Sequence, residues 1–420
     1  KDDAFPQQPH QGSIKSSWRL ELCFSVSILH YQTITTNAIM VDRAHKPSAL
    51  SPSTTGPQPR VNSDGKKVTA SLPSGDSVEV MLYGATVISW KNNGKENMWL
   101  SSNANLEGKK AIRGGVPVVF PVMLTLEMPD DGVTTDQFVC IELRACPQEP
   151  RHIGLPQHGF ARISSWEYLG TTSSESGNQG KGSDDSIRLD FGLTPNNLSD
   201  DMKKAWPYDF SLQYSVTLSK DGLQTMLNVR NEGDKPFDFQ TLFHTYFAVP
   251  VCIRLSLIPL CHRANTLSQD ISKVKVTGLS GIRYIDKILN ATEHDSKGNE
   301  LRFEGTVDRV YKSFTQDTTS ILVDDKPRLD VIRDNMQDTV IWNPWKEGAE
   351  AIADFEPKDG YKNMVCVEAG AVNGWITLEA QDGFEAGQIL KSYLRRKVRI
   401  GHLIPSGYKR DMIVMKEDGT

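Results

Sequence analysis

From Lys67 onward, apolar and polar residues alternate with a period of two along much of the chain. The alternating apolar positions include Val78, Val80, Leu82, Ile187, Leu189, Phe191, Phe210, Leu212, Tyr214, Val216 and Leu218. Successive side chains of a strand point to opposite faces, so this pattern is typical of strands with one buried face. It predicts many short strands.

Helical periodicity is confined to short segments such as residues 200–206. Turns rich in Gly, Asp and Asn separate the alternating segments, and residues 231–234 between two of them predict the loop of a β-hairpin. No G-x-G-x-x-G motif follows an expected strand, so nothing indicates dinucleotide binding. These features predict an all-β fold, a large antiparallel β-sandwich.

The alternation in residues 237–247 places one histidine on a definite face of an expected strand. His244 shares that face with Asp238, Gln240, Leu242 and Tyr246, and the opposite face is largely aromatic. A hydrogen-bonded structural histidine is the commoner fate of such a residue. Its ordinary pKa of about 6.5 nevertheless makes His244 the best proton donor available at neutral pH.

Glu368 is the second candidate, at the end of the apolar run Val365-Cys366-Val367 and just before Ala369-Gly370. Met364, Cys366 and Glu368 are expected on one face of a strand, with the intervening residues on the other. A carboxylate that merely ends a strand is the plain structural interpretation. Carboxylates are seldom buried without a partner, however, and an ionised Glu is a competent general base.

Composition and charge exclude some functions. The 420 residues are enough for one large β domain, and a net charge of −5 with a pI near 6.0 argues against nucleic-acid binding, which requires a basic face. No apolar run is long enough to span a membrane, so we expect a cytoplasmic protein with no membrane partner. The spacing of the six cysteines fits neither a disulfide framework nor a zinc site, so no metal is expected.

The ends and two internal segments differ from the alternating region. Residues 1–66 are expected to be a disordered leader, because Pro, Ser, Thr, Gln and Gly dominate residues 46–65, and Met40 resembles a natural start. A single sandwich domain is expected over residues 67–394, with an unmatched tail at 395–420. Segments 123–154 and 250–269 interrupt it. Inserted loops and unremoved introns both explain them, and their cysteines and lack of periodicity favour introns.

The motif Leu155-Pro156-Gln157-His158-Gly159-Phe160-Ala161-Arg162, with the His244 and Glu368 strands, resembles the glucose-6-phosphate 1-epimerase branch of the aldose 1-epimerase (galactose mutarotase) family. The resemblance covers roughly residues 67–121, 155–249 and 270–384. It implies a galactose mutarotase-like supersandwich that interconverts the α and β anomers of a hexose 6-phosphate without a cofactor.

The resemblance also implies roles for individual residues. Glu368 is the expected base and His244 the expected acid, while Arg113 and Arg162 are the expected phosphate ligands. The residues expected to contact the sugar are Gln157, His158 and Asp308. Taken singly, each arginine reads as a surface residue, His158 as structural and Asp308 as a solvated carboxylate. Trp342 and Trp345 are interpreted as core residues.

Two other functions remain open. A mutarotase for unphosphorylated aldoses does not need Arg113 and Arg162, and a non-catalytic carbohydrate-binding sandwich does not need His244 and Glu368. The expected partner is a small sugar phosphate, and a monomer is favoured.

Overall fold

The computed structural model describes residues 58–123, 154–173, 186–249, 251–252, 267–268 and 270–393. The expected leader up to residue 57, the tail from residue 394 and most of the two expected insertions lie outside these residues. One part of the leader prediction is wrong, because Arg60–Ser63 forms strand β1 and pairs with β2.

Antiparallel strands dominate the fold, as the alternation predicts. Within the described residues, a five-stranded sheet has the order β1-β2-β3-β4-β5. Its strands are β1 (Arg60–Ser63), β2 (Lys67–Ser71), β3 (Ser77–Met81), β4 (Val87–Asn92) and β5 (Lys95–Glu96).

The largest sheet among the described residues has nine strands, in the order β18-β15-β20-β21-β24-β10-β9-β8-β7. Along the chain they are β7 (Glu167–Ser173), β8 (Ser186–Leu193), β9 (Phe210–Ser219), β10 (Gly222–Asn231), β15 (Val274–Thr277), β18 (Glu300–Arg302), β20 (Thr318–Val323), β21 (Lys326–Asp334) and β24 (Gly383–Ser392).

An eight-stranded sheet carries both candidate catalytic strands, in the order β17-β16-β19-β22-β23-β11-β6, with β12 also paired to β23. Its strands are β6 (Val118–Val119), β11 (Phe237–Phe243), β12 (Tyr246–Ala248), β16 (Arg283–Asp286), β17 (Thr292–Asp295), β19 (Val307–Tyr311), β22 (Asp338–Asn343) and β23 (Met364–Leu378). A separate pair joins β13 (Val251–Cys252) to β14 (Leu267–Ser268), inside the second expected insertion.

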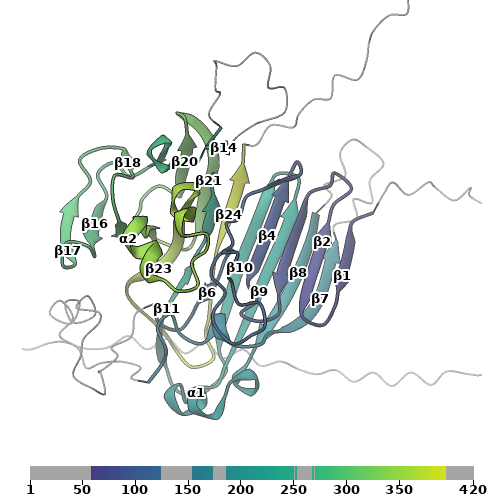
Figure 1. Ribbon diagram of the computed structural model, residues 1–420. Coiled ribbons are helices and arrows are strands. Elements are labelled where there is room, and N and C mark those ends of the chain that lie inside the picture. The colour runs from purple at the N-terminus through teal and green to yellow at the C-terminus, as the bar shows by residue number, and fades with distance from the viewer. Residues whose placement is uncertain are drawn as a thin grey trace, which may run out of the picture. The chain divides into compact units, whose positions relative to one another are not determined.

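The nine-stranded and the eight-stranded sheets, whose strands β9, β10 and β24 and β11 and β23 are labelled in Figure 1, both contribute aromatic or aliphatic residues to the main core. The rings of Tyr214 on β9 and Phe243 on β11 lie 5.8 Å apart, and those of Phe239 on β11 and Phe384 on β24 lie 5.4 Å apart. Val365, Val367 and Ala369 of β23 point into this core. Their neighbours Met364, Cys366 and Glu368 therefore lie on the opposite face of the eight-stranded sheet, as the alternation predicts.

Helices are short and few in the described part of the chain. The α-helices are α1 (Asp200–Ala205) and α2 (Trp345–Ala351), and the 3-10 segments are η2 (Ala161–Ile163), η3 (Pro195–Asn197), η4 (Ile271–Lys273) and η5 (Lys358–Asn363). α1 agrees with the sequence prediction to within one residue. The Ser199 hydroxyl caps it by accepting from the Met202 amide, and two aspartates occupy its first turn.

Two local predictions are wrong. The turn at residues 231–234 does not close a hairpin, because β10 pairs with β9 and β24 whereas β11 pairs with β23 and β6. The turn instead carries the chain from one sheet to the other. Residues 237–247 are not one strand either, because β11 ends at Phe243 and β12 begins at Tyr246. Among the described residues, no helix is both long and apolar enough to cross a bilayer.

Candidate active site

The break between β11 and β12 places His244 opposite Glu368. The His244 amide donates to the Pro117 carbonyl. The chain then enters β12 at Tyr246, which pairs with Cys366 of β23. Glu368 lies two residues further along β23. The His244 Nδ1 and Glu368 Oε1 atoms are 3.2 Å apart, and the two side chains are 12% and 2% exposed. Both can therefore reach a single small ligand.

Burial acts on the two groups in opposite directions. It raises the pKa of Glu368 well above its usual range, with a further rise from Asp308, against which Lys287 and Arg162 act. It lowers the pKa of His244 well below its usual value, and His158, Arg162 and Arg113 add to this effect. Low dielectric disfavours the charged form of each group. Burial therefore favours a neutral imidazole beside a protonated carboxyl.

The motif at residues 157–162 forms a tight turn beside the pair. The Gly159 backbone has φ of +67°, and a Cβ there would collide with the Phe120 carbonyl, so glycine is required. The turn holds His158 with φ of +66° and its ring centroid 5.7 Å from that of His244. His158 Nδ1 lies 2.6 Å from the Met123 carbonyl oxygen, which orients the ring. Gln157, the residue before His158, is exposed.

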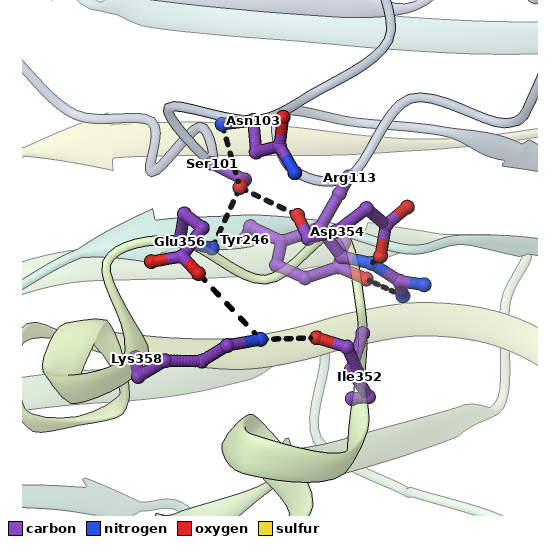
Figure 2. A network of polar contacts seen from close by, with 8 residues as sticks. All are labelled: Ser101, Asn103, Arg113, Tyr246, Ile352, Asp354, Glu356 and Lys358. Atoms are coloured by element: carbon purple, nitrogen blue, oxygen red, sulfur yellow. Dashed lines mark hydrogen bonds and ion pairs between the residues drawn. The ribbon is translucent and has the colours of Figure 1, made fainter.

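Arg113 is held by a dense network of polar contacts (Figure 2). Its Nε donates to Asp354 Oδ1 at 3.0 Å, and its Nη1 donates to the Tyr246 hydroxyl at 3.3 Å. The Ser101 hydroxyl donates to the Asp354 carbonyl and accepts from the Glu356 amide, which ties the loop after α2 to the loop before Arg113. Burial alone would lower the pKa of Arg113, but Tyr246 and Asp354 raise it overall. Arg113 is thus a fixed and largely compensated cation.

Arg162, on η2, is the second cation near the pair and has fewer partners. Its Nη2 donates to the Gln157 carbonyl at 2.9 Å, while its buried Nε has no hydrogen-bond partner among the described residues. Burial and the nearby charge of Arg113 lower the pKa of Arg162 to about 10, although Tyr246 and Asp354 partly oppose this. An anion between the two arginines would relieve that repulsion.

Asp308 on β19 also faces this region, together with a lysine that no sequence motif indicated. Lys287 Nζ lies 3.7 Å from the Asp308 carboxylate, and the Lys287 amide donates to the Asp308 carbonyl. Burial raises the pKa of Asp308, and Lys287 opposes the rise. Lys287 also acts on the pKa values of Glu368 and His158, so it lies within electrostatic reach of the pair.

Aromatic residues form a wall beside His244. The His244 and Tyr246 rings are stacked with centroids 4.6 Å apart, and the Trp342 centroid lies 6.0 Å from that of His244. Trp342 is therefore at the site as well as being packed against buried residues, so interpreting it only as core was incomplete. Asp308 pairs with Trp342, and Trp342 with Cys366, in one row across the sheet.

A different hollow lies further along β23. It has a volume of about 200 Å³ and includes Trp375, Asn335 and the buried carboxylate of Asp338. That carboxylate already accepts from the amides of Ser313, Val372 and Asn373. Because the residues that line this hollow include neither a histidine nor an unsatisfied carboxylate, the hollow does not offer the acid–base chemistry of His244 and Glu368.

Comparison with known proteins shows the family to which the chain belongs. The model of the aldose 1-epimerase family matches residues 66–391, so the chain belongs to that family and is an epimerase that acts on carbohydrates. A relative from Cenchrus ciliaris, provisionally named a glucose-6-phosphate 1-epimerase, is 31% identical over 78% of this chain and 84% of its own.

A relative with the same provisional name, from Escherichia coli strain K12, is 32% identical over 68% of this chain and 77% of its own. The crystal structure of a Salmonella typhimurium protein provisionally named a mutarotase has a TM-score of 0.58 and 25% identity. It covers 80% of this chain and 94% of its own. The predicted galactose mutarotase-like sandwich is therefore confirmed.

Proposed function

We propose that the chain interconverts the α and β anomers of a hexose 6-phosphate, with Glu368 as general base and His244 as general acid. The observation that carries this proposal is the 3.2 Å approach of an imidazole and a carboxylate beside two arginine side chains. The relatives provisionally named glucose-6-phosphate 1-epimerase support the phosphate. A cytoplasmic, monomeric protein stays a prediction from the sequence.

In the proposed reaction, the Glu368 carboxylate takes the proton of the anomeric hydroxyl. The bond between the anomeric carbon and the ring oxygen breaks, its electron pair stays on that oxygen, and His244 supplies the proton. The free aldehyde turns about its bond to the next carbon, and reclosure with reversed roles gives the other anomer. Each positioned acid or base contributes roughly 10²–10⁴-fold to the rate.

The reacting state requires one proton on the pair, carried by His244 while Glu368 is ionised. The pair carries the same number of protons when Glu368 is protonated and His244 is neutral, so only a proton shift within the pair is needed. Arg113 and Arg162 both lower the pKa of His244. A phosphate beside them would offset their charge and raise the pKa of His244, which favours its role as the acid.

Arg113 and Arg162 also favour a phosphorylated sugar over a neutral one. Guanidinium groups bind phosphate oxygens through directed, charge-assisted hydrogen bonds. We assign Gln157, His158 and Asp308 to the sugar hydroxyls. A mutarotase for unphosphorylated aldoses would gain nothing from two half-buried cations near the acid–base pair.

Two-dimensional NMR exchange spectroscopy of glucose 6-phosphate at anomeric equilibrium tests the proposal. The purified protein should increase the rate at which the α and β signals exchange, and a His244→Asn, Glu368→Gln double variant should return it to the spontaneous rate. An unchanged exchange rate with folded wild-type protein would refute the activity.

A further inference from the structure

Three potential metal ligands meet beneath the proposed sugar site. The donor atoms of His244, Cys366 and Glu368 all lie within 4.8 Å of one another, and the three side chains are nearly or fully buried. Cys366 and Glu368 point to the same face of β23 because they are two residues apart, and the break before β12 brings His244 against them.

Two of these donor atoms lack hydrogen bonds. Within the described residues, neither His244 Nδ1 nor Glu368 Oε1 has a hydrogen-bond partner, although they are 3.2 Å apart. Most buried polar atoms in proteins are hydrogen-bonded, so two such atoms side by side are unusual. Both atoms lie close enough together to bind one ion.

The ligand set fits a borderline transition metal. Zinc bonds of about 2.0–2.1 Å to nitrogen and oxygen place two tetrahedral ligand atoms roughly 3.3 Å apart, close to the observed separation of Nδ1 and Oε1. Imidazole, thiolate and carboxylate together suit Zn²⁺ or Co²⁺, whereas Mg²⁺ and Ca²⁺ prefer oxygen ligands alone. Three protein ligands leave one position of a tetrahedral zinc ion for a further ligand.

We propose that His244, Cys366 and Glu368 bind one Zn²⁺ ion, and that this ion reversibly blocks anomerisation by occupying the acid and the base together. The block rests on the proposed function; the binding does not. Binding releases two protons to solvent, one from the Cys366 thiol and one from the acid–base pair. Arg113 and Arg162 oppose a cation here and Asp308 favours it, so we expect the ion to be removable by a chelator.

Substitution of Cys366 tests the zinc site separately from catalysis, because Cys366 has no part in the proposed proton transfers. It packs against Trp99, Tyr246 and Met364. Cys366→Ser and Cys366→Ala should keep basal anomerisation, and the zinc concentration for half-inhibition should rise at least about tenfold, as is usual when metal coordination is disturbed. EDTA should restore the zinc-treated wild-type protein.

Binding is measured separately with Co²⁺, whose thiolate complexes have a charge-transfer absorption band. The protein should carry Ser at the other five cysteines (Cys23, Cys140, Cys146, Cys252 and Cys261), which leaves Cys366 as its only thiol. We expect the band there and its loss on adding Cys366→Ser. If that background does not fold, equilibrium dialysis of wild type against Cys366→Ser should show a difference of one zinc per chain.

The two readouts separate the two claims. No band, no difference in bound zinc, or equal zinc inhibition of wild type and Cys366→Ser would overturn the metal site. A cobalt band in a protein that never accelerates anomer exchange would leave the site in place and remove the proposed function instead.

Discussion

Two regions of the site, the Arg113 corner (Arg113 with Asp354 and Tyr246) and the acid–base corner (His244 with Glu368), differ in how many of their buried polar atoms are hydrogen-bonded. Around Arg113, the guanidinium is bonded to Asp354 and Tyr246, and the supporting loops are tied through Ser101 (Figure 2). Around His244 and Glu368, two buried polar atoms have no hydrogen-bond partner among the described residues. The first corner is pre-organised by its own hydrogen bonds, whereas the second has buried polar atoms that a substrate could contact. We infer that binding specificity is built into the first and chemistry into the second.

The largest expected effect comes from removing the base. Glu368→Gln keeps the shape but cannot accept a proton, so kcat should fall by roughly 10²–10⁴-fold with KM little changed. Saturation curves from polarimetry would measure both. The same substitution at the exposed Glu385 of β24 is the matched control. A Glu368→Gln enzyme with near-normal kcat would contradict the role of Glu368 as the base, and with it the assignment of the chemistry to the His244 and Glu368 corner.

Removal of the arginines should affect binding next. Arg113→Ala and Arg162→Ala should each weaken glucose 6-phosphate roughly ten- to a hundredfold, the value of a charge-assisted hydrogen bond, and glucose much less. Arg162→Ala should have the larger effect, because the charge of Arg162 is less compensated. KM values for both sugars would show this, with Arg188→Ala on β8 as control. Equal losses for both sugars would contradict a phosphate role.

Two substitutions at Asp354 distinguish its effect on the position of Arg113 from the effect of its negative charge. Asp354→Ala should release Arg113 and raise KM for glucose 6-phosphate roughly two- to tenfold, the value of one hydrogen bond. Asp354→Asn keeps an acceptor for Arg113 Nε and removes a negative charge, so KM should stay equal or fall. If both variants raised KM equally, the carboxylate charge itself would be required, and the account of the Arg113 corner would be wrong.

The smallest effect is expected at Lys287. Lys287→Met removes the partner of Asp308, which we assign to a sugar hydroxyl, so KM should rise by a factor of at most about five, the value of a partly exposed ion pair, for glucose and glucose 6-phosphate alike. Lys326→Met on the exposed end of β21 is the control. A loss confined to glucose 6-phosphate would instead place Lys287 on the phosphate.

Local patterns in the sequence predicted much of this structure. Alternation identified β3, β8 and β9 and the two faces of β23, because the side-chain period of a strand depends on its own residues. It could not predict which strands pair. The turn at residues 231–234 resembles a hairpin loop, yet it joins β10 to β11 in another sheet, since long-range pairing decides the partner.

The site residues also fall into those that a local motif predicts and those that only long-range contacts reveal. The motifs identified His244, Glu368, His158 and the arginines, all of which the structure brings to one region. Lys287 and Asp354 were missed, because each acts through a partner distant in sequence and carries no motif of its own. Cys366 was dismissed on cysteine spacing, which cannot reveal a cluster formed across β12 and β23.

The most direct test of the central claim is the ratio of kcat/KM for glucose 6-phosphate to that for glucose, measured by exchange NMR for wild type and for the Arg113→Ala, Arg162→Ala double variant. The account predicts a ratio of at least about ten in wild type, from even one charge-assisted contact, and a ratio near one in the variant. A wild-type ratio near one, or a ratio unchanged in the variant, would contradict it.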